Sequence, residues 1–457
     1  MAIFAFLNQN IECMQKVSIA KGMRDFNSSQ VSKRQYITNT IRNVFETFGY
    51  APLETPSMEN LSTLTGKYGD EGDKLIFRVL KSGDFLKSVP QNAERDAAQW
   101  SSMVSDKALR YDLTVPFARY IASNRNEVKL PFKRYQMQPV WRADRPQKGR
   151  YREFWQCDAD VVGSKSLWQE VELMLLYAEV FERLAVPVRI RISNRSILAS
   201  MAEYAGVAKE FMTFCTILDK VDKIGVSKVV EQWIEMGVEA DSAATLSELI
   251  QMRGLDALVH ASKLNAEATE GVSFVLKQFN ANNTAKNVEL VFDPSLARGL
   301  DYYTGCIFEV EAQGVGIGSI GGGGRYDDLT GIFGVKDVPG VGISFGLDRI
   351  YLVLEELNLF PDDVVGAPLV MGVNFGGEAA AKTFEIISSL RREGMAAEFY
   401  PESLKMKKQF DYANQKGIRY VLIMGDEEMK HERVSLKDMQ TGNQRDVDWK
   451  DLRAAIV

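Results

Sequence analysis

Apolar residues recur at helical spacing in two stretches of the first half of the chain. In residues 33–48, KRQYITNTIRNVFETF, they fall on one face, which predicts an amphipathic helix that ends at Gly49. The next segment, GYAPLETPSMENL, indicates extended chain, and Pro52 and Pro56 confine it to a sheet edge or an interface. A second long amphipathic helix is predicted over 168–184, WQEVELMLLYAEVFERL. The apolar side chains on the face of the first helix are Tyr36, Ile37, Ile41, Val44, Phe45 and Phe48.

Short strand-like runs separated by polar loops follow between residues 74 and 160, namely LIFRVL, RYQMQPVWRAD and REFWQCDADVVG. From about 204 to 286 the chain is rich in Glu, Lys, Ala and Leu, which predicts a separate helical insertion. Strands return from residue 289 as VELVFDP and GCIFEVEAQ. A run dense in glycine comes next, and then the helix LDRIYLVLEELNLFP, which Pro361 ends.

After Gly366 predicted strands alternate with predicted helices. The strands are PLVMGVNF, AAEFY, YVLIMGD and RVSLKDM, and the helices lie near 378–393 and 403–415. Alternation at this spacing is typical of a small α/β domain. The whole chain is therefore expected to be mixed α+β, with a helical insertion and an α/β tail.

Composition narrows the class of protein. The 457 residues are 46% hydrophobic and 25% charged, which is typical of a globular protein with a sizeable core. The net charge of −6 provides no global basic field, so an RNA or phosphate partner must bind a local patch. No apolar run approaches the ~20 residues of a membrane span. The first residues lack the basic region of a secretory signal, so we expect a cytosolic protein. Translation could equally start at Met14.

Cysteine and histidine are too sparse for a metal site built from them. The two histidines are His260 and His431, and no CxxC pair occurs, so no metal ligand is predicted. We expect the cysteines to be buried, reduced thiols. They are Cys13, Cys157, Cys215 and Cys306.

Two short patterns resemble catalytic or cofactor motifs but lack their context. GIGSIG, with Gly316, Gly318 and Gly321, matches a dinucleotide fingerprint, yet it lies deep in the chain and inside a longer glycine tract. GISFG (342–346) matches a nucleophile elbow, but only His431 follows it to complete a triad. The phosphate-binding pattern GxxxxGK[ST] is absent.

The stretch KRYQMQPVWRADRPQKGRYREFWQCDAD (133–160) is more informative. Its centre, RPQKGR, is a turn sequence between two strand-like runs, so we predict a hairpin that is strongly basic. Arginine binds phosphate oxygens in a bidentate manner, and Phe154 and Trp155 offer a stacking surface for a base. An ordinary solvated, charged hairpin explains the composition equally well.

Two further segments carry candidate binding residues. In SLARGLDYYTG (295–305), an arginine beside paired tyrosines is suited to a polar, ring-bearing ligand, although such a pair is more often ordinary strand alternation. In GVGISFGLDRI (340–350), a glycine-rich strand leads into a helix whose first turn contains Arg349, which could face an anion or simply solvent.

Taken in order, these segments resemble the three signature motifs of class II aminoacyl-tRNA synthetases, and among these the histidyl-tRNA synthetases. The helix at 33–48 and the strand ending at Pro56 resemble motif 1, the dimer interface. The arginine hairpin (134–160) resembles motif 2, and GVGISFGLDRI resembles motif 3. RGLDYYTG and GGGGRYDDL (321–329) resemble the two histidine-specific boxes. The resemblance extends from about Lys21 to the C-terminus.

The resemblance implies an antiparallel sheet flanked by helices, with a helical insertion and a C-terminal α/β anticodon-binding domain. The implied divisions are an N-terminal extension (1–20), a catalytic core in two parts (21–203 and 287–362), the insertion (204–286) and the anticodon-binding domain (366–457).

It also implies an activity. The enzyme would activate L-histidine with ATP, assisted by Mg²⁺, and transfer the histidyl group to the 3′ end of tRNA(His), as a cytoplasmic homodimer. A rival is a non-catalytic, synthetase-like regulatory subunit of histidine biosynthesis. Such proteins typically lose motif arginines or the anticodon domain, whereas this chain keeps Arg142, Arg298 and Arg349 and its α/β tail.

The family's catalytic and nucleotide-binding roles fall on matching residues. Arg142 would hold the ATP α-phosphate and Arg349 the γ-phosphate, while Phe154 stacks on adenine and Arg150 assists. Arg298 would lie against the histidine carboxylate and the α-phosphate as a fixed cation. The loop from Arg145 through Gln147 to Arg152 would meet the tRNA acceptor end. Anticodon binding would rest on a local surface around KMKK (405–408) with Phe410 and Tyr412, which is equally consistent with a solvated helix.

The histidine-binding roles fall on four segments. In RYDLT (110–114), Asp112 and Thr114 would bind the α-amino group, helped by Gln156 and Asp160. The three tyrosines would line the imidazole pocket. Many bacterial members have Glu where Asp160 stands, and we expect the shorter acid to work with shifted geometry. The residues implied to bind histidine are Asp112, Thr114, Gln156, Asp160, Arg298, Tyr302, Tyr303 and Tyr326.

Overall fold

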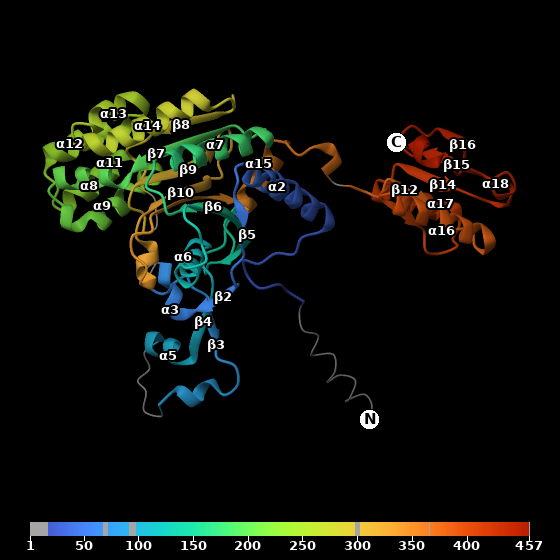
Figure 1. Ribbon diagram of the computed structural model, residues 1–457, viewed down its shortest axis with the longest axis horizontal. Helices are drawn as coiled ribbons and strands as arrows, with labels where there is room; N and C mark the ends of the chain where they lie inside the picture. The colour runs from blue at the N-terminus through green and yellow to red at the C-terminus, as the bar shows by residue number, and fades with distance from the viewer. Residues whose placement is uncertain (1–16, 67–71, 91–96, 298–301, 365, 457) are drawn as a thin grey trace, which may run out of the picture. The chain divides into compact units, whose positions relative to one another are not determined.

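The computed structural model describes residues 17–66, 72–90, 97–297, 302–364 and 366–456. The chain divides into two compact units, Met1–Phe360 and Pro361–Val457 (Figure 1). Among the described residues, no helix has both the length and the apolar character needed to cross a membrane.

An eight-stranded sheet forms the centre of the first unit, in the order β1-β5-β6-β11-β10-β9-β7-β8. Neighbouring strands are antiparallel, except that β1 runs parallel to β5 at one edge and β8 parallel to β7 at the other. Pro52 lies in the edge strand β1, as predicted. The strands are β1 (Ala51–Pro52), β5 (Phe132–Trp141), β6 (Glu153–Val162), β7 (Val188–Asn194), β8 (Val288–Phe292), β9 (Cys306–Ala312), β10 (Ser319–Tyr326) and β11 (Gly340–Gly346).

Three helices cover one face of this sheet: α2 (Ser28–Thr47), α7 (Trp168–Arg183) and α15 (Leu347–Glu356). The predicted helices at 33–48 and 168–184 are confirmed. Helix α2 begins earlier than predicted because Asn27 and Gln30 form a reciprocal capping box at its N-terminus. Helix α15 ends at Glu356, before the predicted end at Pro361. It ends early because the chain turns at Asn358, whose backbone lies in the left-handed region.

The stretch after β7 is helical, as predicted (Figure 1). Its buried side chains, including the stacked rings of Phe214 and Trp233, continue the hydrophobic core of the large sheet. The helices are α8 (Arg195–Tyr204), η2 (Ala208–Glu210), α9 (Phe211–Leu218), α10 (Val221–Ile224), α11 (Val226–Glu235), α12 (Ala240–Gln251), α13 (Gly254–Ala261) and α14 (Ala266–Asn282).

A smaller sheet, in the order β2-β4-β3, has a hydrophobic core of its own, shared with α6. The predicted run LIFRVL forms a strand only over its last residues, in β3. The elements of this region are β2 (Met58–Asn60), α3 (Leu61–Leu64), β3 (Arg78–Leu80), η1 (Phe85–Ser88), α5 (Ala97–Val104), β4 (Ser105–Leu109), α6 (Thr114–Ser123) and η3 (Leu329–Phe333).

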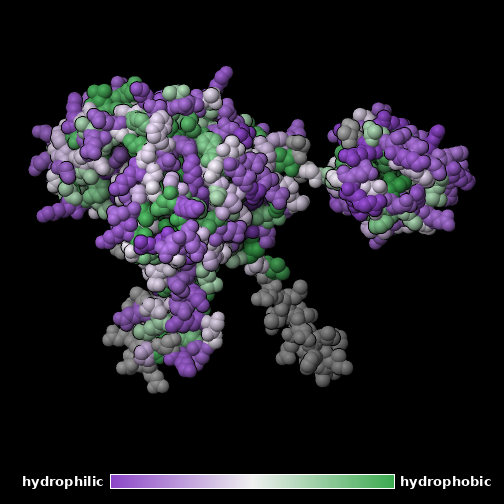
Figure 2. Space-filling view, viewed as in Figure 1, coloured by the Kyte–Doolittle hydropathy of each residue, from purple (hydrophilic) through white to green (hydrophobic). Residues whose placement is uncertain are grey.

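The second unit is a five-stranded sheet in the order β13-β12-β14-β15-β16, whose first three strands are parallel. The predicted alternation of strands and helices is confirmed, whereas β16 was missed because its QRDVD sequence lacks an apolar pattern. The elements are β12 (Val370–Gly372), α16 (Gly377–Arg392), β13 (Ala397–Phe399), α17 (Met406–Lys416), β14 (Tyr420–Ile423), α18 (Asp426–Lys430), β15 (Arg433–Asp438), β16 (Gln444–Asp448) and α19 (Leu452–Ile456), preceded by η4 (Asp362–Val364). On the face shown in Figure 2, hydrophilic side chains cover most of this unit.

Candidate active site

A cavity of about 370 Å³ opens on the side of the large sheet opposite the covering helices. Strand β6 explains why: its side chains alternate, so Cys157, Ala159 and Val161 enter the helix-covered core while Gln156, Asp158 and Asp160 line the cavity. The cavity brings together most of the predicted site residues. They are Asp112, Thr114, Arg142, Arg150, Phe154, Gln156, Asp160, Tyr302, Tyr303, Tyr326 and Arg349.

The floor of the cavity is shaped by glycine. In the register of the two strands, Gly342 of β11 lies opposite Asp160 of β6. A Cβ atom at Gly342 would overlap the Asp160 carboxylate, so only glycine leaves room for this acid to face the cavity. The glycine tract therefore supplies close approach within an antiparallel sheet. Gly316 and Gly318 lie between antiparallel strands β9 and β10, and Ser344 of the GISFG pattern lies within β11.

Asp160 is held by two buried partners. Arg134 Nη2 lies 2.9 Å from Asp160 Oδ2, and the Tyr326 hydroxyl donates to Oδ1 at 2.6 Å. Arg134 is fully buried, with its guanidinium 4.3 Å from the centre of the Phe117 ring. Sequence reasoning did not assign Arg134 to the site. Its buried charge offsets that of the carboxylates around it.

Asp158 also lines the cavity and was missed. Its place on β6, two residues from Gln156 and two from Asp160, was the available signal. Burial raises its pKa to about 7, against the lowering effect of Arg134, and the neighbouring Asp160 raises it further. Burial likewise raises the pKa of Asp160. Among the described residues, Asp158 Oδ1 and Gln156 Oε1 have no hydrogen-bond partner, so this end suits a ligand with several N–H donors.

Three tyrosines complete this acidic end. Tyr302 packs edge-on against Tyr303, with ring centres 4.9 Å apart, and against Tyr326 at 6.2 Å. Burial raises the pKa of both Tyr303 and Tyr326, which keeps their hydroxyls neutral and able to donate. Asp112 accepts from the backbone N–H of Val115 at 3.1 Å, and so holds the start of α6 at the cavity wall.

The opposite end is basic. Arg142 donates from Nε to the Tyr111 carbonyl oxygen at 3.1 Å, and its guanidinium lies 5.2 Å from the centre of the Phe154 ring. Arg349 donates from Nε to the carbonyl oxygen of Gly149 at 3.0 Å. Two arginines held by backbone acceptors beside an aromatic ring can receive an anion attached to a planar base.

The remaining predicted residues lie elsewhere. Arg145, Gln147 and Arg152 belong to the loop between β5 and β6 but do not line the cavity. Arg145 and Gln147 are exposed, and Arg152 donates from Nε to the Asp144 carbonyl oxygen at 3.2 Å. Arg298 lies outside the described residues. Cys157, Cys215 and Cys306 are buried and free of disulfides, as expected, and Cys13 is also outside the described residues.

An antiparallel sheet with helices on one face, and with a basic and an acidic end in one cavity on the other, is the catalytic unit of a class II aminoacyl-tRNA synthetase. The family model of histidyl-tRNA synthetase matches residues 82–350, and that of the anticodon binding domain matches 363–457. The chain belongs to the histidyl-tRNA synthetase family.

Similar proteins agree with this assignment. The histidine–tRNA ligase of Christiangramia forsetii is 50% identical, over 97% of this chain and 99% of its own. The crystal structure of the histidyl-tRNA synthetase from Nostoc sp. has a TM-score of 0.81 and 30% identity, covering 97% of this chain and 99% of that one. An ATP phosphoribosyltransferase regulatory subunit/histidyl-tRNA synthetase from Bacillus halodurans has a TM-score of 0.71 at 18% identity, over 90% of this chain and 98% of that one, and shows the fold alone.

Proposed function

We propose that this chain is a histidine–tRNA ligase that forms histidyl-adenylate in the cavity and passes the histidyl group to tRNA(His). The observation that supports this proposal most is that the basic end and the acidic end belong to one cavity. An anion site at Arg142 and Arg349 shares one cavity with the acids and tyrosines around Asp160. A reaction between ATP and an amino acid with a polar side chain needs both ends in contact.

In the first step, a carboxylate oxygen of histidine attacks the α-phosphorus of ATP. A bond forms between that oxygen and phosphorus, the bond to the β-phosphate oxygen breaks, and pyrophosphate leaves. The carboxylate is already ionised at neutral pH, so no general base is required. Catalysis then consists of positioning and charge neutralisation. We assign these roles to Arg142 at the α-phosphate, Arg349 at the γ-phosphate, Arg150 beside them and Phe154 against adenine, with Arg298 as a further cation.

Histidine would lie at the acidic end. We assign the α-amino group to Asp112 and Thr114, helped by Gln156 and Asp160, and the imidazole to the three tyrosines. Neutral tyrosine hydroxyls donate to an imidazole nitrogen, and carboxylates accept from its N–H or from the ammonium. Such a pocket leaves buried polar groups unpaired when an apolar amino acid enters, which excludes it without a separate editing step.

In the second step, the terminal 3′ adenosine hydroxyl of the tRNA attacks the histidyl carbonyl, and AMP leaves. We assign the acceptor-end contact to the exposed loop with Arg145 and Gln147, and to Arg152 behind it. In the C-terminal unit the lysines of KMKK are exposed, while Phe410 and Tyr412 pack into a hydrophobic cluster. The lysines therefore remain as a proposed RNA-binding surface, and the two rings support the fold beneath them.

Mg²⁺ would enter this site with ATP. The described residues contain no group of three or more His, Cys, Asp or Glu side chains placed to hold a metal ion. Magnesium on a nucleotide commonly needs only one or two protein carboxylates, because phosphate oxygens and water complete its shell. Asp144 on the cavity wall fits that requirement. When bound, the ion would neutralise charge on the triphosphate.

We further propose a cytoplasmic homodimer whose interface includes α2 and β1. The functional divisions proposed are the catalytic core (21–203 and 287–362), the insertion (204–286) and the anticodon-binding domain (366–457), after an extension over 1–20. The rival regulatory-subunit function shares this fold. It is disfavoured by the retained Arg142 and Arg349 at the cavity, which a purely regulatory protein would not need.

ATP–pyrophosphate exchange with each of the twenty amino acids tests the proposed function. We expect exchange with histidine alone, followed by charging of tRNA(His). Exchange with another amino acid would overturn the histidine pocket. A folded protein that exchanges with no amino acid would favour the regulatory subunit.

A further inference from the structure

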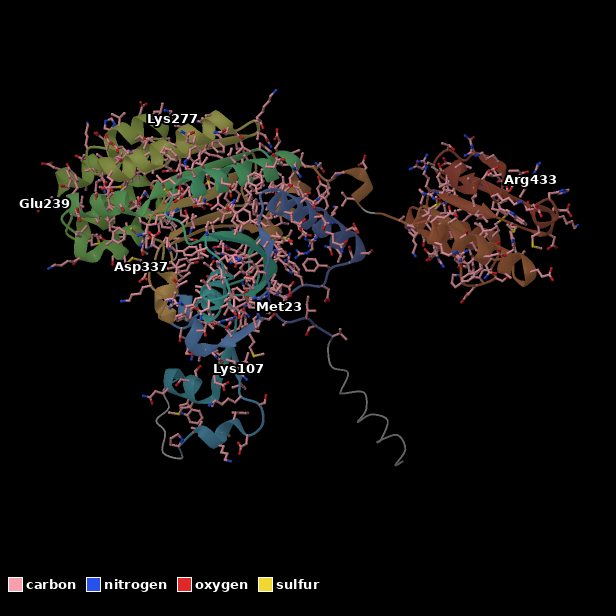
Figure 3. The ribbon with its side chains drawn as sticks, in the orientation of Figure 1. Met23, Lys107, Glu239, Lys277, Asp337 and Arg433 are labelled. Carbon is pink, nitrogen blue, oxygen red and sulfur yellow. The ribbon has the colours of Figure 1, made fainter. Side chains whose placement is uncertain are left out.

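A short segment that precedes α2 contacts the loop between β5 and β6. We name residues 20–26 the N-terminal strap, and residues 142–152, which join β5 to β6, the motif 2 loop. Met23, labelled in Figure 3, marks the strap beside the large sheet. Neither segment is a helix or a strand of the large sheet, so the contacts between the two decide how firmly each is held.

The backbones of the two segments are joined directly. The N–H of Arg152 donates to the carbonyl oxygen of Gly22 at 2.9 Å. The strap turns at this point, with Gly22 at φ +85° and the N–H of Met23 bonded to the carbonyl of Ala20 at 3.0 Å. A Cβ atom at Gly22 would lie 2.8 Å from Arg152 Cγ. Both the dihedral angle and the close approach therefore require glycine here.

Arg24 makes the second link. Its guanidinium carbon lies 3.2 Å from the centre of the Tyr151 ring, and its Nη2 lies 2.5 Å from Asp348 Oδ1. Tyr151 and Asp348 both line the cavity, and Asp348 directly precedes Arg349 in α15. A single strap residue thus contacts the motif 2 loop and the motif 3 helix at the basic end of the site.

Asp348 is a shared anchor. Its side chain is only 4% exposed, and besides Arg24 it pairs with Arg34 of α2 at 2.5 Å. Its other oxygen accepts from the Trp155 N–H at 3.0 Å, at the start of β6. The ring of Phe26 packs against both guanidinium groups, 4.8 Å from that of Arg24 and 4.2 Å from that of Arg34. The strap is therefore fixed to the rigid part of the unit, and can hold the loop in turn.

We propose that the N-terminal strap is a positioning element for the ATP half of the site, with Arg24 as its principal side chain. This inference rests on the proposed function. Ordering a loop costs conformational entropy for each residue fixed, and a loop held before ATP arrives has already met that cost. Arg24 acts through Tyr151 and Asp348, so it is a positioning residue.

The strap should affect the binding of ATP but not the binding of histidine. The motif 2 loop carries both Arg142 and Arg150, which line the basic end of the cavity. The residues at the acidic end, such as Asp112 on the approach to α6 and Tyr326 on β10, are held by contacts that do not involve the strap. Loosening the strap should therefore weaken ATP binding and leave histidine binding unchanged.

The test compares Arg24→Ala, Arg24→Lys and Gly22→Ala with the wild-type chain in histidine-dependent ATP–pyrophosphate exchange. For Arg24→Ala we expect the KM for ATP to rise about 10-fold, in keeping with the loss of one partly buried cation–π and ion-pair contact. The KM for histidine should stay within about twofold. Arg24→Lys keeps a charge for Asp348 but loses the planar stack on Tyr151, so its rise should be intermediate. Gly22→Ala should also raise the KM for ATP, because the added methyl group displaces the strap.

Lys33→Ala is the matched control. Lys33 also joins α2 to α15, through an ion pair with Glu355 at 3.2 Å, but none of its contacts reaches the motif 2 loop. Its KM for ATP should equal that of the wild type.

Hydrogen exchange of the ATP-free proteins gives a second readout, which does not depend on activity. The Arg152 amide, and the motif 2 loop around it, should exchange faster in Arg24→Ala and Gly22→Ala than in the wild type or Lys33→Ala. Equal increases of the KM for ATP and the KM for histidine in Arg24→Ala would overturn the strap's role. Unchanged hydrogen exchange of the motif 2 loop in that variant would overturn it as well. If the wild-type chain shows no histidine-dependent exchange, the proposed function fails, and loop protection still decides the inference.

Discussion

Arg349 of α15 donates from Nε to the carbonyl oxygen of Gly149, 3.0 Å away in the loop between β5 and β6. Its Nη1 also donates to the carbonyl of Ser319, on β10, at 2.5 Å. These two backbone acceptors orient the guanidinium before any ligand binds. Since catalysis by charge stabilisation depends on groups that need no reorganisation, this arrangement favours a direct role for Arg349.

Arg349→Ala should lower kcat/KM for ATP in the exchange reaction by roughly 100-fold or more, the usual cost of removing a preorganised group that stabilises transition-state charge. Lys148→Ala is the control, because Lys148 lies next to Gly149, on the loop that Arg349 contacts, but its side chain is 71% exposed. Among the described residues it forms an ion pair only with the exposed Glu356. That variant should match the wild type. Near-normal kinetics for Arg349→Ala would remove our assignment of the γ-phosphate.

Gly342→Ala should raise the KM for histidine at least about 10-fold with little change in the KM for ATP. The added methyl group would overlap the Asp160 carboxylate, which Arg134 and Tyr326 hold in place. Gly316→Ala is the matched control, since a Cβ atom there meets nothing within 4 Å. Steady-state exchange kinetics at varied histidine would decide it, and an unchanged KM for histidine would contradict the placement of this pocket.

Elements that depend on residues close together in the sequence could be predicted from the sequence alone. Helices α2 and α7 follow from apolar periodicity, and the β5–β6 hairpin follows from the turn residues of RPQKGR. The start of α2 and the end of α15 differ from the predicted bounds, because the capping box at Asn27 and the turn at Asn358 override the apolar pattern. The charged strand β16 carries no apolar signal at all.

Features that depend on long-range register could not be predicted in the same way. The steric need for glycine at position 342 arises only once β11 pairs with β6. Arg134 is an ordinary strand arginine until the fold buries it against Asp160. Asp158 could have been found from its period-two spacing with Gln156 and Asp160, had the strand face been considered as well as the family motif.

The buried ion pair between Arg325 and Glu170 should contribute strongly to the free energy of unfolding of the first unit. Arg325 Nε and Nη2 donate to the two carboxylate oxygens at 2.6 and 2.7 Å, and Glu170 is fully buried. Arg325→Ala leaves that charge unpaired, so we expect a loss of about 3–5 kcal/mol. Arg183→Ala breaks only the exposed pair with Glu179 and should cost less than about 0.5 kcal/mol. Urea unfolding of both variants measures the difference, and equal midpoints would contradict a structural role for the buried pair.

Asp158 should make stability depend on pH. Its pKa is raised to about 7 in the folded chain, mainly by burial, with Asp160 and Asp112 nearby and Arg134 opposing the shift. An unfolded aspartate titrates near 3.9. Between about pH 4 and pH 7 the folded chain therefore holds a proton that the unfolded chain has lost, and this group's contribution to stability falls as the pH rises.

Asp158→Asn removes that proton exchange while keeping the size of the side chain. The free energy of unfolding of the variant, relative to that of the wild type, should therefore be higher at pH 8 than at pH 5, by an amount on the order of 1–3 kcal/mol. Glu179→Gln, at an exposed site, controls for the general loss of one carboxylate. In exchange kinetics, the KM for histidine in Asp158→Asn should lose much of its pH dependence between 6 and 8, because the wild-type cavity gains a charge over that range. Parallel stability curves for the variant and the wild type would show that Asp158 does not titrate there.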